Sequence, residues 1–131
     1  MAINRIHVNA EVDLRLKNLK ARTGLTPNLL CRLGFCLSLS EPGVPDPKLY
    51  QDGAAREFNR YTLTGQWDLL FFSLLRQRLV EDSLDPVRHL EEQFKAHLSR
   101  GVLLLYQRMR SLEDLHTLLK EHQRVASGRV G

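Results

Sequence analysis

The sequence predicts a mainly α-helical fold in which the first forty residues form one short strand and two helices. Apolar and polar residues alternate from Asn4 to Asn9, which is the two-residue period of a strand with one buried face. A helical pattern follows and stops at Gly24, and a second, strongly apolar helical pattern begins at Thr26. A short strand followed by two helices is the outline of a ribbon-helix-helix unit.

The predicted strand has one apolar and one polar side. Ile6 and Val8 lie on the apolar side, and the polar side consists of Arg5, His7 and Asn9. A single strand leaves backbone hydrogen-bonding groups unpaired on both edges until another strand joins it. We therefore expect the strands of two copies of the chain to pair antiparallel, with the polar side facing outward. A two-stranded ribbon of this kind fits a DNA major groove.

The first predicted helix carries an apolar stripe and several basic residues. Val12, Leu16 and Leu19 recur at helical spacing, whereas Lys17 and Lys20 lie off that stripe. The helix ends in an Arg-Thr-Gly sequence, whose glycine accepts the left-handed conformation of a helix C-cap.

The second predicted helix runs from about Pro27 to Leu39. Thr26 before it can accept hydrogen bonds from exposed amide groups, and proline suits the first helical position. The apolar residues of this helix surround most of its circumference: Leu29, Leu30, Leu33, Phe35, Cys36 and Leu37. One strand and one helix cannot cover it, so we expect a second copy of the chain to do so. The amides near Thr26 and Asn28 are suited to binding a DNA phosphate.

Positive charge is concentrated in the first forty residues. They contain six Lys and Arg residues against two acidic residues, whereas the remainder of the chain contains thirteen of each. All of the formal net charge of +4 therefore lies in the segment that resembles a nucleic-acid reader, although a solvated helix face is the other interpretation. The candidate DNA contacts are Arg5, His7, Asn9, Lys17, Lys20, Arg22, Thr26, Asn28 and Arg32.

A proline-rich segment divides the chain. Residues 41–47 contain three prolines and one glycine, which exclude a helix interior and a central strand. We expect a linker or a rigid surface loop here. The predicted organisation is a DNA-binding unit at 1–40, a helical extension at 41–124 that packs on it and forms oligomer contacts, and a flexible tail at 125–131.

Aromatic residues mark the segment after the linker. Phe58, Tyr61 and Leu63 are expected to anchor the chain in a core, although an aromatic residue beside an arginine can also stack on bases. Thr64 is a candidate N-cap for a helix that continues to about Val80, because apolar residues recur at helical spacing across this stretch.

Two further helices are predicted in the C-terminal third. Asp85 followed by proline is a strong helix start. A long apolar stripe follows at spacings of three and four: Leu90, Phe94, Leu98, Gly101, Val102, Leu105 and Met109. Gly101 indicates either the close approach of another helix or a break, because glycine costs about 1 kcal/mol relative to alanine inside a helix. Ser111 and Asp114 resemble a capping box that restarts a last helix.

The sequence carries no recognisable catalytic or metal-binding motif. The five histidines form no H-E-x-x-H motif, and no Gly-rich loop precedes a lysine. Cys31 and Cys36 lie about 140° apart on the second helix, which favours buried, reduced thiols over a disulfide. Neither a secretory pattern nor a membrane-length apolar run is present, so we expect a cytoplasmic, non-catalytic protein without a cofactor.

Three ordered motifs resemble one known family. They are Arg22-Thr23-Gly24-Leu25-Thr26-Pro27-Asn28, Gly43-Val44-Pro45-Asp46-Pro47 and Glu57-Phe58-Asn59-Arg60-Tyr61-Thr62-Leu63-Thr64-Gly65. Together they resemble the DndE family of DNA sulfur-modification proteins, over the chain from its N-terminus to about residue 115. That family works beside the enzymes that replace a non-bridging phosphate oxygen of bacterial DNA with sulfur.

The resemblance implies a small ribbon-helix-helix protein that binds DNA, including nicked duplex, as an oligomer with a basic surface. Lys17 and Lys20 are the matching basic positions of this sequence. We therefore expect an accessory protein of DNA phosphorothioate modification, a restriction-modification-like system. Its partners would be double-stranded DNA, further copies of itself in a homodimer or homotetramer, and the other modification proteins.

Two other functions remain open from the sequence. A ribbon-helix-helix transcriptional repressor would use Arg5, His7 and Asn9 to read base edges. A DNA-nicking enzyme would need a carboxylate cluster and a divalent metal, and Glu57 and Asp68 could contribute to such a cluster. Single carboxylates of this kind are more often ion-pair partners.

Overall fold

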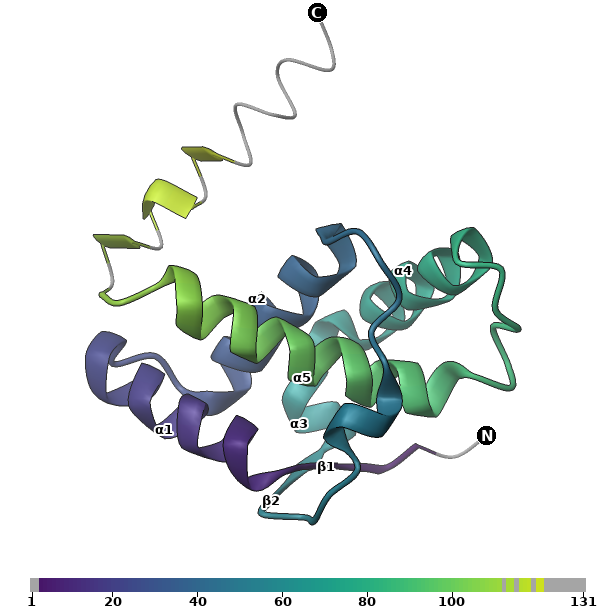
Figure 1. Cartoon of the computed structure of the whole chain (residues 1–131), viewed down its shortest axis with the longest axis horizontal. Helices are drawn as coiled ribbons and strands as arrows, with labels where there is room; N and C mark the ends of the chain where they lie inside the picture. The colour runs from purple at the N-terminus through teal and green to yellow at the C-terminus, as the bar shows by residue number, and fades with distance from the viewer. Residues whose placement is uncertain (1–2, 112, 115, 119, 122–131) are drawn as a thin grey trace, which may run out of the picture.

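The computed structural model describes residues 3–111, 113–114, 116–118 and 120–121. It is mainly helical, as the sequence predicts, with one two-stranded sheet (Figure 1). The elements in chain order are β1 (Arg5–Val8), α1 (Ala10–Thr23), α2 (Pro27–Ser40), the 3-10 helix η1 (Pro47–Tyr50), β2 (Arg56–Asn59), α3 (Arg60–Thr64), the 3-10 helix η2 (Gly65–Trp67), α4 (Asp68–Glu81) and α5 (Leu90–Arg108).

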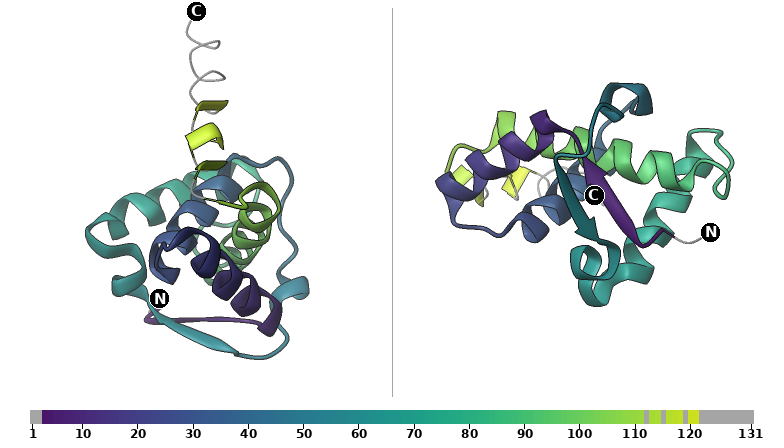
Figure 2. Two further views of the ribbon diagram at one scale, coloured as in Figure 1. Left: turned by 90° about the vertical axis from the view of Figure 1, so that its left-hand side faces the viewer. Right: turned by 90° about the horizontal axis from the view of Figure 1, so that it is seen from below.

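Both strands of the sheet belong to the same chain. β1 pairs antiparallel with β2, with Arg5 opposite Asn59 and Val8 opposite Arg56. The sheet lies along one edge of the helical body (Figure 2). The expected pairing of β1 with a second copy of the chain is wrong, because the segment that follows α2 returns to the sheet and supplies β2.

The predicted alternation of buried and exposed side chains in β1 holds as far as Val8. Ile6 and Val8 are buried, and Arg5 and His7 are exposed, as predicted. Asn9 is buried instead of facing outward, because its side chain accepts a hydrogen bond at 2.9 Å from a backbone amide in the first turn of α1. Asn9 is therefore the N-cap of α1.

The turn between α1 and α2 has the caps that the sequence predicts. Gly24 has a φ of 76°, the left-handed conformation that favours glycine, and its amide donates to the Lys20 carbonyl oxygen at 2.8 Å. The Thr26 hydroxyl accepts a hydrogen bond from the Leu29 amide at 3.3 Å, and Pro27 is the first residue of α2. Local sequence therefore determines where both helices begin and end.

α2 is the centre of the fold, and α5 lies across it (Figure 1). A β-carbon placed on Gly101 would lie only 1.8 Å from the carbonyl oxygen of Gly34, so the two backbones touch at this crossing. Gly101 therefore marks a close helix approach and not a break. The expectation that a second copy must cover α2 is wrong, because α1, α3, α4 and α5 of the same chain pack around it.

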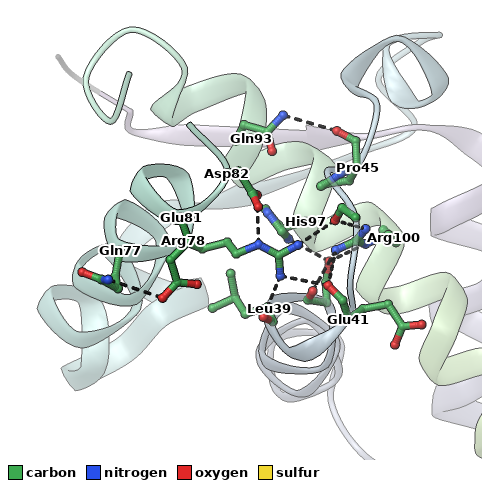
Figure 3. Close-up of polar contacts among 12 residues, drawn as sticks. Leu39, Glu41, Pro45, Gln77, Arg78, Glu81, Asp82, Gln93, His97 and Arg100 are labelled. Atoms are coloured by element: carbon green, nitrogen blue, oxygen red, sulfur yellow. Dashed lines mark hydrogen bonds and ion pairs between the residues drawn. The ribbon is translucent and has the colours of Figure 1, made fainter. Parts of the chain in front are cut away.

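Two arginines hold the C-terminal end of α2 (Figure 3). Arg78 of α4 donates to the carbonyl oxygens of Leu39 at 2.8 Å, Glu41 at 2.9 Å and Gly43 at 2.6 Å. Arg100 of α5 also donates to the Gly43 carbonyl oxygen, at 2.8 Å. Carbonyl groups at the end of a helix lack helical partners, and α2 has no basic residue in its own last turn. The two guanidinium groups from other helices supply the missing donors and positive charge.

His97 of α5 lies fully buried beside this arginine pair (Figure 3). Its Nδ1 atom lies 2.8 Å from the Ser38 hydroxyl oxygen. Burial, followed by the positive charges of Arg100 and Arg78, lowers the pKa of His97 to about 3. The imidazole is therefore neutral at pH 7.

The segment before α4 differs in detail from the prediction. Thr64 does not cap α4, because it is the last residue of α3 and its hydroxyl donates to the Asp68 carboxylate at 2.8 Å. The first turn of the predicted helix is the 3-10 helix η2, and α4 begins at Asp68. Phe58 and Leu63 are buried as predicted, whereas Tyr61 is exposed.

The C-terminal predictions hold in part where the structure describes the chain. Every residue of the predicted apolar stripe on α5 is buried. The Asp85 carboxylate accepts hydrogen bonds at 2.8 and 3.1 Å from the amides of Val87 and Arg88. It caps a turn and not the predicted helix, because α5 begins only at Leu90 and has no side-chain N-cap. The Asp114 carboxylate accepts a hydrogen bond from the Ser111 amide at 3.1 Å. Part of the predicted last helix and the predicted tail at 125–131 lie outside the described residues.

Candidate nucleic-acid interface

α1 carries four basic side chains on two separate flanks. At 100° per residue, Arg15 and Arg22 lie about 20° apart around the helix, and Lys17 and Lys20 lie about 60° apart. The two pairs are about 140° to 160° from each other, and the buried stripe of α1 lies between them. We call Lys17 and Lys20 the lysine flank, and Arg15 and Arg22 the arginine flank.

The lysine flank lies beside a carboxylate, that of Asp13, which pairs with two cations. Lys17 Nζ lies 3.0 Å from Asp13 Oδ2, and Arg56 Nε of β2 lies 2.5 Å from Asp13 Oδ1. Burial raises the pKa of the Asp13 carboxyl, but hydrogen bonds from Arg56 and Lys17 outweigh burial and lower it. Lys20 is exposed and forms no ion pair within the described part of the chain. Three cations against one carboxylate leave this flank positive.

The arginine flank packs against Tyr106 of α5. The guanidinium carbons of Arg15 and Arg22 lie 4.3 and 4.7 Å from the centre of the Tyr106 ring. Arg22 also donates a hydrogen bond to the phenol oxygen at 3.3 Å. That hydrogen bond is the largest of the influences that lower the pKa of Tyr106. Among the residues that the structure describes, neither arginine forms an ion pair with a carboxylate.

The N-terminus of α2 follows directly after α1. Thr26 is exposed and Asn28 is half-buried, so the first turn of α2 is at the surface, as predicted. Arg32 is different, because it donates to the carbonyl oxygens of Leu63 at 2.5 Å and Thr62 at 3.2 Å. Its Nε and one terminal nitrogen thus fasten α3 to α2, which leaves fewer N–H donors for the predicted phosphate contact.

The remaining predicted contacts lie on the sheet. Arg5 Nη1 and His7 Nε2 lie 3.5 and 3.1 Å from the same carboxylate oxygen of Glu57 on β2, which offsets the positive charge of Arg5. Asn9 is excluded as a DNA contact, because its side chain caps α1. A cleft of about 410 Å³ beside β1 is lined by residues of both charges: Ile3, Arg5, Ile6, His7, Arg88, Glu91, Glu92 and Lys95. The sheet is therefore less positive than α1.

Several arginines outside α1 are neutralised within the protein. Ion pairs join Arg60 to Asp68 at 2.9 Å and Arg108 to Glu41 at 3.1 Å. Arg78, besides its carbonyl contacts, forms an ion pair with a neighbouring carboxylate at 2.9 Å. Exposed cations also lie elsewhere in the chain, among them Lys48, Arg76 and Arg88, but α1 carries four basic residues within its 14 residues.

Sequence reasoning missed Arg15 and Tyr106 as candidate contacts. The spacing of Arg15 and Arg22 was an available signal, because seven residues are almost two helical turns and place both side chains on one flank. No local signal points to Tyr106, because its contact with α1 depends on where α5 crosses the molecule.

The carboxylates that a nicking enzyme could use lie in separate ion pairs. Glu57 contacts Arg5 and His7, and Asp68 contacts Arg60. Within the residues that the structure describes, no group of three or more His, Cys, Asp and Glu residues could hold a metal ion.

The two cysteines differ in exposure. Cys31 is buried, as predicted, and burial raises the pKa of its thiol to about 12. Cys36 is exposed, so the expectation of two buried thiols is wrong for this residue. Along the described ranges, we find no helix with the length and apolar character needed to cross a membrane.

Comparison with known proteins relates this fold to one family. The family model described as DNA sulphur modification protein DndE matches residues 5–113. The chain belongs to the DndE family. The crystal structure of DndE from Escherichia coli B7A, involved in DNA phosphorothioation modification, has 25% sequence identity and a TM-score of 0.65, and the match covers 80% of this chain and 98% of that one.

A second DndE structure supports the same fold. It is a crystal structure of a DndE mutant involved in DNA phosphorothioation, with 21% identity and a TM-score of 0.58, and the match covers 79% of this chain and 99% of that one. No curated protein matches the sequence. The family match thus agrees with the resemblance carried by the three sequence motifs.

Proposed function

We propose that this protein is a non-catalytic, DNA-binding accessory protein of bacterial DNA phosphorothioate modification. It acts in the cytoplasm, binds double-stranded DNA, including nicked duplex, and holds that DNA for the enzymes of sulfur transfer. The observation that carries the proposal is the basic region on α1 beside the exposed first turn of α2, in a chain of the DndE family.

The lysine flank is the main contact with the DNA backbone in this proposal. Lys17 and Lys20 are long, flexible cations at the surface, and such side chains neutralise phosphates without reading sequence. Thr26 and Asn28 present the N-terminal end of α2, where backbone amides and the helix dipole favour an anion. These contacts fix the position of a duplex and leave its base sequence unread.

Self-association is part of the proposal. Trp67, Leu70 and Leu74 recur at spacings of three and four, and their exposed fractions are 50%, 50% and 43%. An exposed apolar stripe of this kind is typical of a protein interface. A second copy of the chain on this stripe would give the homodimer or homotetramer that we propose, with several basic regions in one particle.

The two alternative functions are less well supported. A repressor that reads bases with Arg5, His7 and Asn9 would need an outward-facing intermolecular ribbon, but β1 pairs within the chain and Asn9 is buried. A nicking enzyme would need Glu57 and Asp68 to act together, but each belongs to a different ion pair.

Fluorescence anisotropy tests the proposed function. Purified protein is titrated against intact duplex, nicked duplex and single-stranded DNA of matched sequence, and against a duplex of scrambled sequence, over a series of salt concentrations. We expect binding to both duplex forms, with little sequence preference and steep weakening by salt. Strong sequence preference without response to a nick would favour a repressor, and absence of binding would reject DNA as the ligand.

A further inference from the structure

The arginine flank differs from the lysine flank in being pre-assembled. The guanidinium carbons of Arg15 and Arg22 lie 4.3 and 4.7 Å from the centre of one ring, that of Tyr106. The face of an aromatic ring attracts cations, so Tyr106 holds both side chains near one another. Neither has a carboxylate partner within the described part of the chain. Two unneutralised positive charges are therefore gathered at one point of the surface.

Hydrogen-bond donors surround this point. Each guanidinium group offers several N–H donors in a planar fork. The Tyr106 oxygen already accepts a hydrogen bond from Arg22, so its own O–H remains as a donor. Asn18 is three residues after Arg15 and four before Arg22, which places its side chain on the same flank between them. The arginine flank thus combines two positive charges with an excess of donors.

The two positive charges of the arginine flank favour a phosphate monoester over a phosphodiester. A phosphate monoester carries a charge of about −1.5 to −2 at pH 7 and three acceptor oxygens, whereas a phosphodiester carries a single negative charge. Charge-assisted hydrogen bonds from two guanidinium groups match the monoester better. Phosphates within a continuous DNA strand are diesters, so a monoester occurs in DNA only at a strand end.

We propose that Arg15, Arg22 and Tyr106 form a binding site for a phosphate monoester, which in DNA is the terminal phosphate at a strand break. The assignment of DNA as the source rests on the proposed function above. The lysine flank, on the opposite side of the buried stripe, contacts the continuous backbone. The two flanks therefore have separable roles: the lysines bind any duplex, and the arginines recognise its broken strand.

The first test compares nicked duplexes that differ only in their end groups. One carries a 5′-phosphate at the nick, one a 3′-phosphate, and one hydroxyl groups on both sides. We expect one of the phosphorylated nicks to bind about tenfold more tightly than the unphosphorylated nick in fluorescence anisotropy, the ratio that one good charge-assisted contact supports. Equal affinity for all three duplexes would overturn the strand-end assignment while leaving the proposed DNA binding intact.

Three double variants separate this site from the rest of the interface. Arg15→Gln with Arg22→Gln should abolish the preference for the phosphorylated nick. Lys17→Ala with Lys20→Ala should weaken binding to all three duplexes and leave their ratio unchanged. Lys48→Ala with Arg76→Ala, which removes two exposed cations from other elements, should change neither. A phosphate preference that survives in the arginine variant would refute the site, provided that its circular dichroism matches the wild type.

A second test does not depend on DNA. Inorganic phosphate and the diester dimethyl phosphate are titrated separately into labelled protein, and the side-chain Nε–H signals of Arg15 and Arg22 are followed by NMR. We expect inorganic phosphate to shift these signals at a concentration at least about tenfold lower than dimethyl phosphate. Unchanged arginine signals, or equal responses to both anions, would contradict a monoester site. A phosphate response without any preference among the nicked duplexes would support the site and assign it to a free phosphate.

Discussion

The crossing of α2 and α5 gives the most quantitative prediction, for the variant Gly101→Ala. A β-carbon at this position would lie 1.8 Å from the Gly34 carbonyl oxygen and 2.2 Å from its carbonyl carbon. Both are backbone atoms, so the helices must separate by roughly 1.5 Å to reach an ordinary contact. Overpacking of this kind lowers the free energy of unfolding by about 1 to 3 kcal/mol, and an overlap with backbone atoms falls at the upper end of that range. Alanine regains about 1 kcal/mol of helix propensity.

The net effect of Gly101→Ala is therefore a loss of about 2 kcal/mol in the free energy of unfolding. The corresponding fall in melting temperature is about 8 °C for a chain of this size. Urea titration followed by circular dichroism measures the change. Gln107→Ala, at an exposed position on the same helix, is the matched control and should stay within about 0.5 kcal/mol of the wild type. Equal or greater stability of Gly101→Ala would refute the close crossing.

Three further predictions concern the arginine pair, the buried histidine and the apolar stripe. Arg78→Met removes the donor to the Leu39 carbonyl oxygen and to the Asp82 carboxylate, and it leaves Arg100 as the remaining arginine donor to the other two carbonyl oxygens. Urea titration should therefore show a loss of about 3 kcal/mol or more, whereas Arg76→Ala on the same helix should be nearly neutral. His97 has a pKa of about 3 in the folded state, so only the unfolded state gains its proton as the pH falls below about 6.5. The free energy of unfolding should fall by roughly 2 kcal/mol between pH 7 and pH 5 from this residue, and His97→Gln should remove that share of the pH dependence. Leu70→Glu with Leu74→Glu should lower the particle mass measured by light scattering. The control Leu49→Glu, at an exposed position on η1, should leave that mass unchanged. An unaltered mass in the double variant would show that the apolar stripe is not the interface.

The first two helices could be predicted closely because their ends are encoded by neighbouring residues. Gly24 takes a conformation that few other residues adopt, and Thr26 and Pro27 start α2 within one turn. The partner of β1 could not be predicted in the same way. β2 is only four residues long and follows β1 by about fifty residues, so its pairing depends on the whole intervening chain.

The residues of the candidate interface also differ in how far the sequence predicts their exposure. The exposure of Lys17, Lys20 and Thr26 follows from helical period and capping, and the structure agrees with it. Arg32 looked equally free in the sequence, but its hydrogen-bond partners are carbonyl groups of α3, thirty residues away. The grouping of Arg15 with Tyr106 needed the position of α5. Tertiary contacts therefore decide which basic residues remain available.

The salt dependence of DNA binding tests the central claim most directly. Each phosphate contact contributes a slope of about −0.9 to the dependence of log K on log salt, so Lys17→Ala with Lys20→Ala should reduce the slope by about 1.8. The control variant, Lys48→Ala with Arg76→Ala, removes the same charge from elsewhere and should keep the wild-type slope. If Lys17→Ala with Lys20→Ala also keeps the wild-type slope, the lysine flank is not the surface that binds the DNA backbone.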